Sequence, residues 1–185
     1  WNGATQTVNG VFSASGDCNE LITINSNIAG NPAMIMRPNG TVSISYAVLK
    51  DIHASGGANF IANNSIDLGN NSGWTINSPA SQNLFWVGNT GNWQDGNHWS
   101  YSSGGSPSGC SPNPFTNVFF DSNSFSATGQ TVSITAATAY CKNMSWAGVT
   151  NSPVLAGPSS SLLEIYGSLG LNVNMNMTFG GPVNF

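Results

Sequence analysis

Short runs in which apolar and polar residues alternate recur along the chain. They occupy residues 21–24, 41–46, 131–135 and 162–166. Alternation with a period of two places the apolar side chains on one face of a β-strand. Clusters of Gly, Asn, Ser and Pro separate these runs, and no segment carries the apolar spacing and end caps of a helix. The pattern therefore predicts an all-β protein.

Two architectures fit such a series of short strands. In a parallel β-solenoid, or β-helix, stacked rungs bury ladders of Ile, Val, Leu and Met, while Asn side chains satisfy the corners. The alternative is a tandem β-sandwich, whose antiparallel strands need tight hairpin turns. Few Asn-Gly dipeptides, which are typical of such turns, lie between strong strand runs, and Asn9-Gly10 and Asn39-Gly40 are the candidates. We therefore favour parallel β-solenoid repeat modules over the sandwich.

Three short anchors recur in the same order, about 120 residues apart, which indicates an internal repeat. The paired anchors are Gln6–Val8 with Gln130–Val132, Cys18–Leu21 with Cys141–Met144, and Asn31–Ala33 with Ser152–Val154. The stretch Ser78–Gln82 reads as a short linker. We accordingly expect residues 1–82 to be the C-terminal part of one module and residues 83–185 the N-terminal part of the next. The chain is then an excised fragment of a longer repetitive protein.

The composition narrows the classes of function. Only 5% of residues are charged, although 39% are apolar and 10% aromatic, so the chain is not of the disordered type. Three cations in all argue against nucleic-acid binding and against a polybasic membrane patch. No apolar run reaches the length of a membrane span. Few lysines, and cysteines within Gly/Pro loops, indicate a secreted or cell-surface location.

The stretch 85–100 holds three tryptophans among Gly and Asn residues: Trp86, Trp93 and Trp99. One hypothesis makes them a platform on which sugar rings stack. The other makes them an apolar cap at the seam between two modules. We favour the seam, which predicts that the three rings are buried at the boundary between residues before 82 and after 100. Exposed, coplanar rings would instead indicate glycan contact.

The same stretch carries a resemblance to a known class of proteins. Phe85–Trp93, then Asp95, then His98-Trp99-Ser100, resembles the W-x-G-x-x-G-N-W-x-D-x-x-H/N-W openings of very large secreted surface proteins of Bacteroidota and of autotransporter-like passenger regions. Residues 45–57 with 70–74 are similar to closing rungs of these β-helical repeats, and residues 118–125 are a third shared element. The resemblance implies a giant adhesin of the gliding-motility or type IX secretion kind, and it carries over no catalytic residue.

The three cysteines require an explanation, because an odd count is unusual for a secreted protein. Cys110 lies in a Pro/Gly-rich loop, and Cys141 lies in the same expected module. We expect a Cys110–Cys141 disulfide. In the repeat register Cys18 is the equivalent of Cys141, so its own partner would lie outside the chain and Cys18 would be a free thiol. Three buried, unpaired thiols are the alternative. No zinc-ligand spacing is present.

An enzyme on a β-helix, such as a polysaccharide lyase or hydrolase, needs clustered carboxylates. Charge gathers only around Asp51 and His53, and we interpret these two as a solvent-facing pair on one rung. No Gly-x-Ser-x-Gly motif is present. Asp95, Asp121 and Asn123 offer oxygen ligands for Ca²⁺, but Asp and Asn are also ordinary turn residues. We therefore expect no enzyme, no metal site and no cofactor.

The sequence as a whole favours a structural or adhesive repeat segment of a large secreted bacterial surface protein, serving as stalk or filament. Its partners would be neighbouring modules of the same chain and surface glycans. A carbohydrate-binding module using Trp86, Trp93 and Trp99 is the alternative, and a polysaccharide lyase or hydrolase is the third hypothesis.

Overall fold

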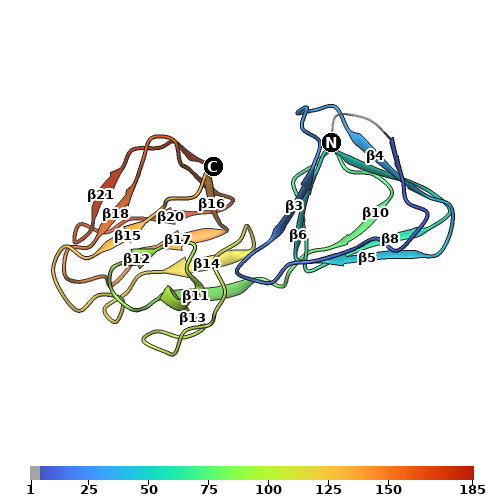
Figure 1. Ribbon diagram of the computed structural model, residues 1–185. Helices are drawn as coiled ribbons and strands as arrows, with labels where there is room; N and C mark the ends of the chain where they lie inside the picture. Colours follow the sequence, from blue (N-terminus) through green and yellow to red (C-terminus); the bar gives the residue numbers. More distant parts are fainter. Residues whose placement is uncertain (1–4) are drawn as a thin grey trace. The chain divides into compact units, whose positions relative to one another are not determined.

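The computed structural model describes residues 5–185. The chain divides into two compact units, Trp1–Ala80 and Ser81–Phe185 (Figure 1). The division falls close to the boundary expected at residue 82, and the derivation of both units from one repeat stays a prediction. No helix within the described residues is long and apolar enough to cross a membrane.

Unit 1 is built from three parallel sheets. Its strands are β1 (Thr5–Thr7), β2 (Ser13–Ser15), β3 (Ile22–Asn25), β4 (Ala33–Arg37), β5 (Thr41–Ser45), β6 (Ala47–Lys50), β7 (Ile52–Gly56), β8 (Asn59–Asn63), β9 (Ile66–Asp67) and β10 (Trp74–Asn77). The sheet orders are β1-β4-β7, β10-β8-β5-β2 and β3-β6-β9. Three successive strands thus enter three different sheets, and the next three return to these sheets in the same order.

Unit 2 repeats this succession after a different beginning. Its elements are β11 (Gln82–Trp86), β12 (Gly91–Asn92), the 3₁₀ helix η1 (Gly96–His98), β13 (Trp99–Ser100), β14 (Thr116–Phe119), β15 (Thr131–Ser133), β16 (Thr138–Cys141), β17 (Asn143–Ser145), β18 (Val154–Gly157), β19 (Leu162–Ile165), β20 (Leu169–Gly170), β21 (Asn176–Phe179) and β22 (Val183–Asn184). The sheet orders are β13-β11-β14-β17-β20, β12-β15-β18-β21 and β16-β19-β22. Of the described ladders, β11–β13 is antiparallel.

The all-β expectation is confirmed, and each of the four alternating runs overlaps a strand, namely β3, β5, β15 and β19. In β5 the apolar Val42 and Ile44 are buried, whereas Thr41 and Ser43 are exposed. The parallel ladders differ from the antiparallel pairing on which a β-sandwich is built.

Apolar ladders across neighbouring strands form a separate core in each unit. In unit 1, Ile44 on β5 lies opposite Ala62 on β8, and both are buried. In unit 2, Val132 on β15 lies opposite Leu155 on β18, and both are buried. Parallel pairing in register aligns the inward positions of successive strands, so a period-two pattern becomes a continuous apolar interior.

Single residues make two of the corners between sheets in unit 1. Tyr46 joins β5 to β6 with a φ of 51°, and Asp51 joins β6 to β7 with a φ of 54°. A left-handed residue redirects the chain within one peptide unit, which lets the next strand start at once in the adjacent sheet. This conformation is uncommon for non-Gly residues and costs about 1 kcal/mol or more.

Candidate functional site

The tryptophan-rich stretch forms the first strands of unit 2. Trp86 lies on β11, Trp99 lies on β13, and Trp93 directly follows β12. Their side chains are 0%, 0% and 1% exposed, respectively. The expectation that all three are buried is confirmed, whereas their expected place at a seam between two modules stays a prediction.

A local reversal of the chain puts these rings together. Asp95 accepts a hydrogen bond from the backbone N–H of Asn97 (2.9 Å) at the start of η1, and the chain then returns along β11 as β13. Trp86 lies opposite Trp99 in this antiparallel pair. The indole Nε1 of Trp99 donates to the backbone oxygen of Trp93 at 2.7 Å, which satisfies its polar atom inside the core. β13 thereby covers the edge of β11 that β14 leaves free.

The aromatic cluster centres on Phe120. Its ring stacks on Trp146 at 3.8 Å between centroids, and it meets Trp99 at 5.7 Å and Trp86 at 6.0 Å. The recorded ring contacts of the three tryptophans all lie within residues 86–120 of unit 2. A saccharide reaches none of these three rings unless the core opens, so they present no platform for sugar stacking.

His98 completes the cluster, and sequence reasoning assigned it no role. Its ring stacks on Trp86 at 4.9 Å, and its Nδ1 lies 3.0 Å from the carbonyl oxygen of Val87, to which it donates. A Cβ on Gly91 would come within 2.1 Å of the His98 ring, so only glycine fits opposite it. The sequence contains a signal for this contact, because a histidine directly precedes Trp99 and a glycine lies two residues before Trp93.

The outward face of the β11-β14-β17 sheet carries a ladder of amides. Asn117 Nδ2 donates to Asn83 Oδ1 at 2.8 Å, and Asn143 Nδ2 donates to Asn117 Oδ1 at 2.7 Å. Next to it, Phe85 stacks on Phe119 at 4.9 Å. Identical residues in register allow each amide to donate on one side and accept on the other. The ladder lies within the strands of a sheet, whereas the sequence predicted asparagine ladders at corners.

Asp51 differs from its predicted place. The corner φ takes it out of the strand that carries His53, and it is 2% exposed rather than facing solvent. Its carboxylate accepts hydrogen bonds from the side chain of Asn70 and from the backbone N–H of Gly30 (3.0 Å). The bond from Asn70, followed by that from Gly30, lowers the pKa of Asp51 below its ordinary value, against the effect of burial. The predicted solvent-facing Asp51–His53 pair is therefore wrong.

The predicted cysteine pairing is also wrong. Cys141 is a free, buried thiol, whereas Cys18 and Cys110 are each disulfide-bonded. Cys141 is on β16 opposite Ile165, and its side chain points into the core of unit 2. Cys18 lies in a partly exposed loop before β3, so the two cysteines that the repeat register equates occupy different environments. Burial raises the pKa of Cys141 to about 12.

The oxygen-bearing residues considered for calcium are engaged in local turns. Asp95 Oδ1 accepts from the N–H of Asn97, and Asp121 Oδ1 accepts from the N–H of Asn123 at 2.9 Å. Within the described chain, no group of three or more His, Cys, Asp or Glu residues is gathered as a metal site would need. The turn interpretation accounts for these residues.

Comparisons with protein-family models, with curated proteins and with solved structures gave no match to this chain.

Proposed function

We propose that this chain is a structural segment of a secreted bacterial surface protein, a parallel β-solenoid whose role is extension and display as part of an adhesin stalk or filament. The observation that carries the proposal is the order of strands, which visits three sheets in turn and returns to each one in parallel register. Such a path adds length by stacking further coils, so it suits a spacer better than a compact binding domain.

The surface chemistry supports the same role. Amide ladders such as Asn83–Asn117–Asn143 satisfy one another along the stack without charge. Only 5% of the residues are charged, so stacked coils place few like charges next to each other. Disulfide-bonded Cys18 and Cys110 fit an oxidising, extracellular setting.

The carbohydrate-binding hypothesis and the lyase or hydrolase hypothesis each rely on residues that have other roles in the structure. The carbohydrate-binding hypothesis relied on Trp86, Trp93 and Trp99, which serve the core of unit 2. The lyase or hydrolase hypothesis relied on charge near Asp51, whose carboxylate is occupied by Asn70 and Gly30 at a buried corner. Neither gains a specific observation, and the spacer is the function that the geometry supports best.

Single-molecule pulling on the full chain tests the spacer. Coils that unwind one after another should release steps of about 20–40 residues, or roughly 70–140 Å of extended chain each. That step matches the spacing between paired strands such as β18 and β21. Unfolding of each unit in one step without substeps, or turnover of a polysaccharide by the intact chain, would contradict the proposal.

A further inference from the structure

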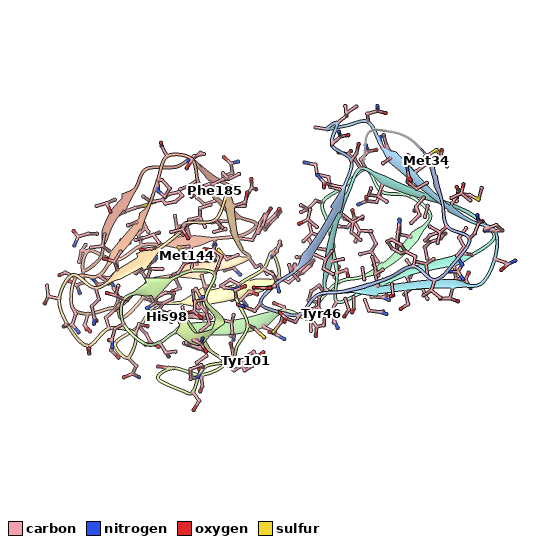
Figure 2. All side chains as sticks on the ribbon, in the orientation of Figure 1. Met34, Tyr46, His98, Tyr101, Met144 and Phe185 are labelled. Atoms are coloured by element: carbon pink, nitrogen blue, oxygen red, sulfur yellow. The ribbon has the colours of Figure 1, made fainter. Side chains whose placement is uncertain are left out.

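The β1-β4-β7 sheet of unit 1 carries two methionines on its outward face. Met34 and Met36 are two residues apart on β4, so their side chains leave the sheet on the same side. Ile35 between them is 1% exposed and belongs to the core, which makes the side of the methionines the outer one. Met34 is 37% exposed (Figure 2), and Met36 is half-buried. Two thioether sulfurs therefore lie on one accessible face.

The parallel register places a histidine beside this pair. His53 on β7 lies directly opposite Met34. Neighbouring strands are about 4.8 Å apart, and residues i and i+2 of one strand are about 6.6 Å apart. A methionine side chain has three rotatable bonds, so both sulfurs can turn towards the imidazole. The three side chains, named here the Met/Met/His cluster, can therefore meet on one small ion.

The side chains of the Met/Met/His cluster have no recorded structural role within residues 5–185. Neither Met34 nor Met36 belongs to the apolar core of unit 1. No recorded hydrogen bond of this part of the chain engages the imidazole of His53, whereas that of His98 is held by Val87 and stacks on Trp86. The lone pairs of the cluster are thus available to a ligand.

The charges near the cluster favour a cation. The carboxylate of Asp51 interacts electrostatically with His53, two residues further along the chain. The guanidinium of Arg37, which follows Met36, donates to the carbonyl oxygens of Asn39 and Gly10 at 3.0 and 2.9 Å. These bonds hold the nearest positive charge in the sequence at the turn after β4.

The ligand atoms define the kind of cation. Thioether sulfur is a soft ligand that selects Cu(I), and imidazole also suits copper, whereas Ca²⁺ and Mg²⁺ prefer oxygen. A thioether binds without losing a proton and does not form disulfides. It is therefore a soft ligand that remains usable in the oxidising setting indicated by disulfide-bonded Cys18 and Cys110.

We propose that Met34, Met36 and His53 bind one Cu(I) ion on the outward face of β4 and β7. The two thioether sulfurs and one imidazole nitrogen are the ligands, and all three come from unit 1. The ligands weighed from the sequence were those of zinc and calcium, and thioethers are not among them. The site is independent of the spacer role and adds a binding activity to it.

A second pair of methionines provides the matched control. Met175 and Met177 have the same spacing, and Met177 is 41% exposed. Leu155 rather than a histidine lies opposite Met177, and Met175 packs against the core of unit 2. This pair has the thioethers without the imidazole.

Titration of the intact chain with Cu(I) in the absence of oxygen, in competition with the chelator bicinchoninate, measures the affinity. We expect one Cu(I) per chain. Met34→Leu, Met36→Leu and His53→Gln each remove one ligand and should weaken binding by at least about tenfold. Met177→Leu should leave the affinity unchanged. Leucine is close to methionine in volume, so these variants keep the fold.

Methyl NMR of the chain labelled with ¹³C-methyl methionine locates the ion. Ag⁺ is the probe, because it shares the preference of Cu(I) for sulfur and is stable in air. One equivalent should shift the methyl signals of Met34 and Met36. The signals of the other three methionines, Met144, Met175 and Met177, should stay in place.

Three results would overturn the site. The first is a Cu(I) affinity no higher than that of the Met34→Leu/Met36→Leu double variant. The second is an equal loss of affinity in Met36→Leu and Met177→Leu. The third is binding of Ag⁺ that leaves the Met34 and Met36 signals unshifted, as capture by the thiol of Cys141 would. Each of these results leaves the proposed spacer intact, because the pulling experiment involves no metal.

Discussion

At the scale of single residues, Asp51 is a buried carboxylate at a corner with left-handed backbone. Both of its recorded hydrogen-bond donors, from Asn70 and Gly30, lie in other loops of unit 1. Asp51→Asn places an amide N–H where one of these donors now points, and a donor facing a donor loses the bond. We expect a lower unfolding midpoint in urea, with the exposed Glu20→Gln as the control for one lost charge.

The pH dependence follows from the lowered pKa of Asp51. A carboxyl group whose pKa is lower in the folded state contributes stability above its unfolded value, here 3.8, and this contribution is lost as the pH falls through the folded value. Urea melts between about pH 2 and pH 6 should therefore show a drop below about pH 4 that is smaller in Asp51→Asn. An equal drop in the variant would assign the acid sensitivity to other groups.

The pKa of Cys141 is raised, whereas that of Asp51 is lowered. Its pKa of about 12 keeps the thiol protonated at neutral pH, and its side chain is fully buried. Thiol reagents act on the thiolate, so the native chain should resist labelling and react at Cys141 only after unfolding. Peptide mapping of the labelled, unreduced protein gives the measurement. Labelling of Cys141 in the native state at the rate of an exposed thiol would contradict the burial of its side chain.

At the scale of the elements, Phe120 joins the first strands of unit 2 to the loop after β17 through its stack on Trp146. Phe120→Ala should lower the free energy of unfolding by about 3–5 kcal/mol, as for other large aromatic residues removed from a core. Phe119→Ala is the matched control, since the adjacent Phe119 points outward and is partly exposed. Urea unfolding followed by tryptophan fluorescence measures both, and similar losses would contradict the central role of Phe120.

The amide ladder should show a graded response. Asn117 both donates to Asn83 and accepts from Asn143, whereas Asn83 takes part in one bond of this ladder. Each net hydrogen bond contributes about 1 kcal/mol, so Asn117→Ala should cost about 2 kcal/mol and Asn83→Ala about half as much. Thermal or urea unfolding of both variants checks the ratio. Equal losses would mean that the ladder does not stabilise the stack bond by bond.

At the scale of the whole molecule, the low charge content predicts weak dependence on salt. The one contact between oppositely chargeable side chains recorded in the described chain joins Asp95 and His98 at 4.0 Å, and it is an ion pair only when His98 is protonated. Ion pairs near the surface contribute about 0–1 kcal/mol. Raising NaCl from about 20 to 500 mM screens such pairs and should shift the melting temperature by no more than about 2 °C. A shift of many degrees would reveal electrostatic interactions that these contacts do not account for.

The sequence determined the local properties of this protein. Alternation within runs such as Thr41–Tyr46 gave strands, because inward and outward positions are set by a period of two along one segment. The apolar character of Trp86, Trp93 and Trp99, with Gly and Asn around them, was enough to anticipate their burial. These features depend on residues close together in the chain.

Only the tertiary structure decided which distant groups meet. Cys141 faces the core because of its register with Ile165, and no spacing between cysteines reveals that register. Asp51 is buried because its corner turns it towards Gly30 and Asn70, about twenty residues away in either direction. Parallel partner strands such as β18 and β21 are separated by two other strands in the chain, so the partner of a side chain depends on the length and corners of the intervening segment, which local alternation leaves open.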